Sequence, residues 1–177
     1  MGRVSKEEAV KYVAGVLYPS DKLFDSVLSL FSSILGDADF KSREVDFKFT
    51  DYYEKEMGRG LKRCFVSFEK RLKPSLLAEV KLKTNDVELR LSADGKRKVN
   101  IDPGYLDLSK LVVASTKDAT YRICLNNGVF AQGMLYYEHG SFKPWQWAYQ
   151  DYREGFSIAF FNKVREIYKE QLASGKN

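Results

Sequence analysis

A chain of 177 residues, 44% hydrophobic and 30% charged, has the composition of a folded globular protein and not of a disordered one. Its formal net charge of +5 permits attraction to anions but names no partner. Because no apolar stretch reaches the length of a membrane span and the N-terminus has no apolar signal core, we expect a cytoplasmic protein with no membrane partner. We expect one domain over residues 1–177, with flexible ends at 1–7 and 174–177.

The cysteines and the histidine argue against two familiar kinds of site. Cys64 and Cys124 each lie in an apolar run, and we interpret both as buried, reduced thiols. Together with one histidine, His139, they are too few and too distant for a zinc site of the usual kind. The sequence also lacks the GxxxxGK[ST] and GxGxxG loops, so we expect no P-loop nucleotide site.

The first part of the chain predicts three strands and one helix. The apolar run from Val10 to Leu17 predicts a buried strand. Ser20 suits the N-cap of a helix with an apolar face, which Gly36 ends. Residues 44–49 alternate between charged and apolar side chains, which predicts a strand with one buried face, and 61–69 form a third strand.

The segment from Pro74 to Leu91 fits two structures. Its leucines and valines can share the apolar stripe of a helix that begins at Pro74, or they can alternate along a hairpin with its turn at Asn85-Asp86. The pattern favours the helix slightly. After a turn at Asp94-Gly95, Val99 to Ile101 form a short strand.

The last part of the chain predicts a hairpin and a long helix. Leu111 to Ala114 is an apolar segment whose type the pattern leaves open. Asn126-Asn127-Gly128 is a strong hairpin turn within residues 121–137, and His139-Gly140 is a second turn. Gly155 to Ala173 has the apolar face of an amphipathic helix.

Taken in order, these elements predict an α+β fold. The sequence strand, helix, strand, strand, helix, strand is that of a ferredoxin-like split βαβ sandwich. We expect this sandwich to be extended by the β-hairpin and the C-terminal helix, for which the open face of the sheet is the obvious packing surface.

Three polar clusters follow predicted strands, where sites are usually built. The loop from Asp51 to Gly60 combines carboxylates that suit Mg²⁺ or acid–base chemistry, a second cluster precedes a turn at Pro103-Gly104, and a third follows residue 116. Turns and structural ion pairs are the alternative interpretation of all three. The candidate ligand-binding residues are Asp51, Tyr52, Tyr53, Glu54, Asn100, Asp102, Lys117, Asp118 and Arg122.

Three classes of function fit these features, and the sequence leaves open whether the protein is an enzyme. The favoured class is the binding, with or without turnover, of a phosphorylated or otherwise anionic small molecule at the candidate residues. The first alternative is a protein-interaction or scaffold domain, which would use a flat apolar patch near Trp145 and Trp147 and have no deep pocket.

The second alternative is an RNA-binding module. The order of elements matches an RRM, and Tyr12, Arg63 and Phe65 could form a stacking platform on one face of the sheet. The basic clusters at 62–63, 70–73 and 96–98 are interpreted as solvated surface.

Several segments in one order resemble a known family. TDYYEKEMG at 50–58, RCFVSF at 63–68, VNIDPGYL at 99–106, ASTKD at 114–118 and DYR at 151–153 resemble an uncharacterised family of small bacterial proteins, a domain of unknown function with some members labelled GTP-binding. The resemblance covers nearly the whole chain and implies no established activity.

Two details limit what this resemblance implies. The family pattern has His at the position of Tyr121 and Glu at the position of Gln132, so the chain lacks two groups that could transfer protons. Thr116-Lys117-Asp118 matches the guanine-reading element of GTPases only in part, because the spacer residue is missing. Without a phosphate loop, we do not transfer the GTP-binding label.

Overall fold

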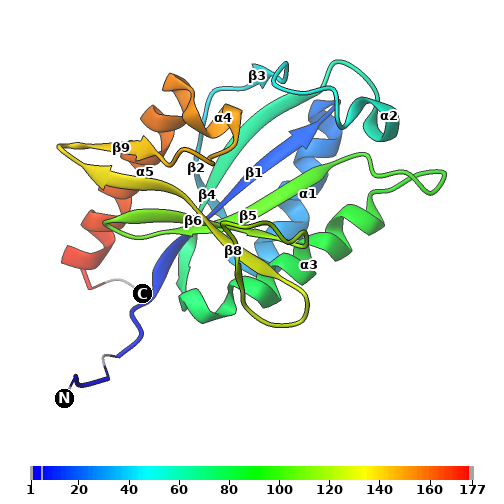
Figure 1. Ribbon diagram of the computed structural model, residues 1–177. Coiled ribbons are helices and arrows are strands. Elements are labelled where there is room, and N and C mark those ends of the chain that lie inside the picture. Colours follow the sequence, from blue (N-terminus) through cyan, green and yellow to red (C-terminus); the bar gives the residue numbers. More distant parts are fainter. Residues whose placement is uncertain (1, 5, 176–177) are drawn as a thin grey trace.

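The computed structural model describes residues 2–4 and 6–175 and has one mixed sheet-and-helix architecture (Figure 1). Its strands are β1 (Val10–Tyr18), β2 (Ala38–Lys41), β3 (Val45–Asp46), β4 (Lys62–Leu72), β5 (Asn100–Leu106), β6 (Lys110–Ser115), β7 (Ile123–Cys124), β8 (Phe130–Glu138) and β9 (Ser141–Pro144). Its helices are α1 (Asp21–Leu35), α2 (Glu54–Met57), α3 (Leu77–Arg90), α4 (Gln150–Arg153) and α5 (Gly155–Ala173), with a 3₁₀ turn at Pro74–Leu76 before α3.

All nine strands belong to one sheet, in which neighbouring strands are antiparallel. The order is β2-β4-β1-β5-β6-β8-β7, while β3 also pairs with β4 and β9 with β8. The α+β class is therefore confirmed. No helix in the described part of the chain combines the length and the apolar character needed to cross a bilayer.

Two apolar cores hold helices against opposite faces of the sheet. One face packs against α1 and α3 through side chains such as Val16, Phe31 and Val87. The other face packs against α5 through side chains such as Phe65 and Phe161. Burying each large apolar side chain contributes about 1.5–3 kcal/mol, so both layers are needed for the fold.

Because α5 covers the second face, the predicted RNA-stacking platform is wrong. Tyr12 and Phe65 are buried, with 0% and 1% of their surfaces exposed, and they belong to the cores on opposite faces. Arg63 is also buried, which corrects its interpretation as solvated surface. The two cysteines are free thiols, but only Cys64 is buried, and Cys124 is exposed on β7 near the sheet edge.

Several predicted elements are confirmed, and others need correction. The first strand, α1, the hairpin at 126–128, the turn at 139–140 and α5 form as predicted, and the segment after Pro74 is the helix. The strand expected over 44–49 is reduced to β3, and the main edge partner of β4 is β2, which was not predicted because its four residues show no clear alternation. The polar loop after residue 50 contains the short helix α2.

The flexible ends expected at 1–7 and 174–177 stay a prediction. Residues 1, 5 and 176–177 lie outside the described residues, so the flexibility predicted for the two ends is not tested. The first strand begins at Val10 and the last helix ends at Ala173.

The largest correction concerns β5, which runs straight through the predicted turn at Pro103-Gly104. β5 pairs with β1 from Lys11↔Leu106 to Leu17↔Asn100, but it pairs with β6 only from Gly104 to Leu106. Ile101 directs its N–H and C=O away from β1, since they bond to Glu88 and Lys81 of α3. Pro103 faces the same way and has no N–H to donate, so β6 cannot continue the pairing there.

Gly104 stands at the point where β5 and β6 begin to diverge. A Cβ added there would lie 2.4 Å from the backbone carbonyl oxygen of Val112 on β6. Glycine is therefore required by this close approach of the two backbones. On the Asn100 side of Gly104, β5 and β6 separate and leave a fork between them.

We expect Gly104→Ala to destabilise the protein by about 1–3 kcal/mol, because the new methyl group meets backbone that cannot move aside. Urea unfolding would measure this loss. The matched control is Gly133→Ala on β8, whose Cβ would make an ordinary contact at 3.6 Å with Trp145. The control should stay within about 0.5 kcal/mol of the parent protein. Equal losses in both variants would contradict the role given to Gly104.

Candidate functional site

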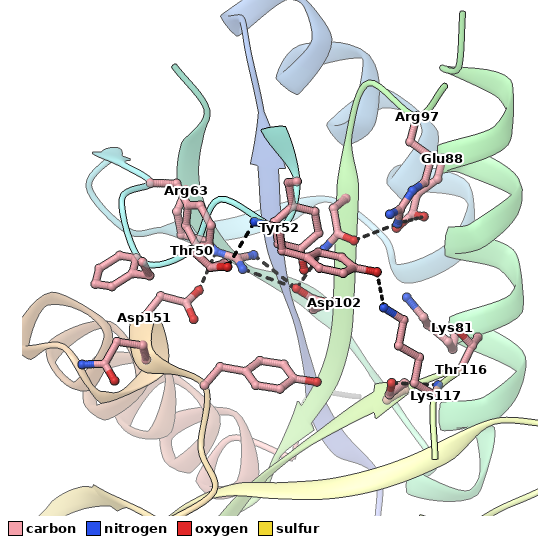
Figure 2. Close-up of a pocket in the computed structure, with 18 of the residues that line it drawn as sticks. Thr50, Tyr52, Arg63, Lys81, Glu88, Arg97, Asp102, Thr116, Lys117 and Asp151 are labelled. Carbon is pink, nitrogen blue, oxygen red and sulfur yellow. Dashed lines mark hydrogen bonds and ion pairs between the residues drawn. The ribbon is translucent and has the colours of Figure 1, made fainter. Parts of the chain in front are cut away.

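A pocket of about 690 Å³ lies in the fork between β5 and β6, and we call it the fork pocket (Figure 2). Its walls come from β5, the end of β6, α3, the loop before α2 and the segment that begins α4. The charged residues in its lining are Arg63, Lys81, Arg97, Lys117 and Arg122, with Glu88, Asp102 and Asp151.

One side of the fork pocket is built around the buried Arg63. Its guanidinium forms an ion pair with Asp151 at 2.7 Å and donates to Asp102 Oδ2 at 3.4 Å. Gly15, which pairs with Asp102 across the sheet, makes room for this group, since a Cβ there would lie 2.9 Å from Arg63. Two carboxylates thus lie against one buried cation, so its charge is fully compensated.

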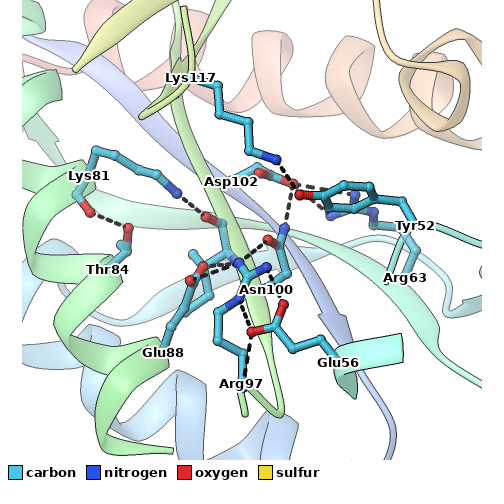
Figure 3. A network of polar contacts seen from close by, with 11 residues as sticks. Tyr52, Glu56, Arg63, Lys81, Thr84, Glu88, Arg97, Asn100, Asp102 and Lys117 are labelled. Carbon is cyan, nitrogen blue, oxygen red and sulfur yellow. Dashed lines mark hydrogen bonds and ion pairs between the residues drawn. The ribbon is translucent and has the colours of Figure 1, made fainter. Parts of the chain in front are cut away.

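A second arginine, Arg97, lies just before the start of β5 and is neutralised by carboxylates (Figure 3). Arg97 forms a two-pronged ion pair with Glu56, at 2.8 and 2.7 Å, and a longer one with Glu88 at 3.3 Å. It also donates to Asn100, which in turn donates to Asp102. Arg97 is half-buried, which corrects its interpretation as solvated surface. The polar contacts therefore run continuously from α2 to Asp102.

Helix α3 supplies a polar stripe to the fork pocket. Lys81, Asn85 and Glu88 stand at positions i, i+4 and i+7, so they share one face of the helix. The Lys81 ammonium donates to the carbonyl oxygen of Ile101 at 2.7 Å, and Glu88 accepts from the N–H of the same residue at 2.6 Å. These two side chains satisfy the edge of β5 that β6 leaves unpaired.

Arg122 crosses the fork pocket from the segment before β7. It donates to Gln132 at 2.8 Å, to Ser115 at 2.8 Å and to the Tyr149 hydroxyl at 2.9 Å. It also donates to the carbonyl oxygen of Lys117. All of these acceptors are uncharged, so they orient the guanidinium without neutralising it.

Lys117 and Tyr52 meet across the mouth of the fork pocket. The ammonium donates to the phenol oxygen and lies 4.3 Å from the centre of the Tyr52 ring. This hydrogen bond with Lys117 lowers the pKa of Tyr52. Figure 2 places Lys81 and Lys117 on the same side of the pocket, near Thr116 and away from Asp151.

Burial changes the acid–base properties of several lining groups. It raises the pKa of Glu88 and of Asp151, although Lys81 and Arg63 act in the opposite direction on these two carboxyls. Burial also raises the pKa of Tyr53, and it raises the pKa of Tyr149 to about 12. Both phenols therefore keep their protons near neutral pH and can donate hydrogen bonds.

A family model described as "Domain of unknown function (DUF4416)" matches residues 8–168. The chain belongs to the DUF4416 family. This confirms the resemblance seen in the sequence, and the description of the family names no activity. No curated protein and no solved structure matches the chain.

Six of the nine candidate residues lie together in the fork pocket, and three lie outside it. Those in the lining are Tyr52, Tyr53, Asn100, Asp102, Lys117 and Arg122. Asp51 and Glu54 are exposed, and Glu54 pairs with Arg59. Asp118 is exposed and accepts from the backbone N–H of Ala119. The polar composition of the sequence identified the three segments that border the pocket, but it could not predict which of their side chains point into it.

Sequence reasoning missed the contribution of α3 and α4. Lys81 and Glu88 have a helical spacing that could have identified them, but the prediction for this segment considered only its apolar residues. Arg63 and Arg97 were assigned to basic surface clusters, and Asp151 was noted only as part of the resemblance. Nothing local indicates that these residues meet Asp102.

The carboxylates do not gather as a metal site would require. Among the described residues no group of three or more His, Cys, Asp or Glu side chains is placed to hold a metal ion. Glu56, from the loop expected to suit Mg²⁺, is instead paired with Arg97. Mg²⁺ binding stays an untested prediction.

The two tryptophans cover the free edge of β8 between β7 and β9. The indole N–H of Trp147 donates to the carbonyl oxygen of Gly133 at 2.9 Å. The backbone N–H of Trp145 donates to the carbonyl oxygen of Met134 at 3.1 Å. Their rings stack at 5.3 Å, and Tyr121 stacks on Trp147. This arrangement gives both tryptophans a structural role at an edge that would otherwise be unpaired.

We expect Glu56→Gln to lower stability by roughly 1 kcal/mol at neutral pH, because Arg97 loses its two-pronged ionic partner while part of Glu56 is solvated. The hydrogen bond with Arg97 lowers the pKa of Glu56, so its stabilisation is present above the ordinary glutamate pKa. It is lost as the pH falls through the lowered value. Thermal unfolding of both proteins should therefore show a Tm difference that shrinks on acidification.

The matched control for this experiment is Glu79→Gln on α3. Glu79 pairs with Lys83 on the solvent side of the helix, so its replacement should change Tm little at any pH. A Tm difference for Glu56→Gln that persists in acid, or no difference at neutral pH, would contradict the assigned role.

Proposed function

We propose that the fork pocket binds a small anionic molecule that carries a phosphate or carboxylate group. The observation that supports this most directly is that Lys81, Lys117 and Arg122 line the pocket without a carboxylate partner among the described residues. Arg63 and Arg97, in the same pocket, are each paired with two carboxylates.

Lys81 is the most informative of the three cations. It is 94% buried, and within the described chain its ammonium makes one hydrogen bond, to a backbone carbonyl. Its electrostatic neighbour Glu88 forms its ion pair with Arg97 instead. Glu88 acts electrostatically on Lys81, but no carboxylate of the described residues is in direct ion-pair contact with its ammonium, and burying a cation in this way is unfavourable. An anion in the pocket would supply the missing charge.

The size and lining of the pocket agree with a small molecule. A volume of about 690 Å³ lies within the range of about 300–1,000 Å³ that is common for such sites. Phe47, Phe49 and Tyr53 add an apolar wall, with ring centres 5.5–5.9 Å apart. A mixed lining of this kind suits a ligand with an anionic group and a less polar body.

The arrangement of the first strands supports a finer description of the fold. We propose that β1, α1, β2, β4, α3 and β5 form a ferredoxin-like unit, because their sheet order β2-β4-β1-β5 and two packed helices follow the split βαβ pattern. In this proposal the fork pocket lies at the junction between that unit and the added hairpin and helices.

We expect Lys81→Met to weaken the binding of inorganic phosphate at least about tenfold, measured by calorimetry, because the buried cation is lost. Methionine keeps the length of the side chain while removing the charge. The variant should also lose about 1–3 kcal/mol of stability, because methionine leaves the buried carbonyl oxygen of Ile101 without its hydrogen bond. A thermal melt without ligand tests that second expectation.

The matched control is Lys83→Met, two residues along the same helix. Lys83 is half-exposed, pairs with Glu79 and lies outside the fork pocket, so this variant should bind phosphate like the parent protein. Unchanged phosphate affinity in Lys81→Met, or an equal loss in Lys83→Met, would contradict an anion site in the fork pocket.

A further inference from the structure

Asp102 has one carboxylate oxygen that makes no hydrogen bond within the described residues. Arg63 and Asn100 both donate to Oδ2, at 3.4 and 3.1 Å. Oδ1 accepts no hydrogen bond from the described residues, and it is not among the buried atoms that lack a partner. Since Asp102 lines the pocket and its side chain keeps 15% exposure, Oδ1 is open to the pocket.

Two phenols lie in the same lining and are available to a ligand. Tyr53 makes no hydrogen bond through its hydroxyl within the described chain, and the Tyr149 hydroxyl accepts from Arg122 while its proton remains free to donate. Asp102, Tyr53 and Tyr149 all line the fork pocket, and Asp102 acts electrostatically on both phenols. This region offers one strong acceptor and two donors.

A ligand hydroxyl matches this set of groups better than a ligand amine. A hydroxyl donates to Asp102 Oδ1 and accepts from a phenol, and it carries no charge. An amine would bring a further positive charge into a lining where Lys81, Lys117 and Arg122 have no carboxylate in ion-pair contact among the described residues. The apolar wall of Phe47 and Phe49 suits the carbon skeleton of a ring.

We propose that the ligand of the fork pocket is a hydroxylated phosphate, such as a phosphorylated sugar or polyol. The phosphate lies at Lys81, Lys117 and Arg122, and a hydroxyl group donates to Asp102 Oδ1. This inference rests on the proposed function and adds the group that gives the pocket its specificity. Asp102 is a specificity-determining residue, while the three cations provide affinity for any small phosphate.

The test compares glucose 6-phosphate with cyclohexylmethyl phosphate, which has the same ring size and anionic group but no hydroxyls. Inorganic phosphate is the third probe, and calorimetry on the full chain gives each dissociation constant. We expect the parent protein to bind glucose 6-phosphate at least about tenfold more tightly than cyclohexylmethyl phosphate, since a hydrogen bond to a carboxylate is a strong one. Equal affinities would overturn the inference.

Asp102→Asn then assigns this preference to one residue. The variant should reduce the preference for glucose 6-phosphate to less than about threefold, while its affinity for inorganic phosphate does not fall, because removing a carboxylate makes the lining more positive. A preference that survives in Asp102→Asn overturns the inference, although the anion site stands. If the parent protein binds none of the three phosphates, the proposed function itself is wrong.

Asp102→Asn removes a charge beside Arg63 and could fail to fold, so a second variant tests the same inference. Tyr53→Phe removes one hydroxyl and leaves the arginine and its carboxylates intact. It should lower the preference for glucose 6-phosphate several-fold without changing the affinity for inorganic phosphate. The control is Tyr136→Phe, whose ring lies against Trp145 and outside the fork pocket. Equal effects of the two phenylalanine variants would overturn the inference.

Discussion

β5 separates from β6 between Asn100 and Pro103, and the position of every other group in the fork pocket follows from this separation. Pro103 removes the N–H that would continue the pairing, and Gly104 lets the two backbones approach just before they part. The edge of β5 that is left free must then be satisfied, because unpaired buried backbone groups are costly. Lys81 and Glu88 of α3 satisfy it, and in doing so they bring a cation and a carboxylate to the pocket.

The charges around the fork pocket divide into two groups with different roles. Arg63 and Arg97 are held by carboxylates from several elements, which ties α2, α4 and the sheet together. Lys81, Lys117 and Arg122 meet neutral partners within the described residues. The two arginines and their carboxylates stabilise the packing of these elements. The other three cations have no carboxylate in ion-pair contact among the described residues, so they are available to an anionic ligand. This difference, and not net charge, carries the functional argument.

The sequence predicted well whatever depends on local pattern. β1, α1, the Asn-Gly hairpin and α5 each have a strong local signature, and the loops with Tyr52 and Lys117 were identified by composition. The interior of the site was not predicted, because it depends on contacts between distant segments. Pro103-Gly104 suggested a turn locally, yet pairing with β1 extends the strand through it. Lys81 became visible only once its segment was known to be a helix packed beside β5.

Lys81, Lys117 and Arg122, which have no carboxylate in ion-pair contact among the described residues, form one anion site in this proposal. The most direct measurement is a crystal structure of the protein soaked in selenate, a divalent tetrahedral anion whose selenium gives an anomalous signal. The account predicts an anomalous peak within hydrogen-bond distance of Lys81, with Lys117 and Arg122 turned toward it. Selenate found at surface lysines, with the fork pocket free of it at saturating concentration, would contradict the account.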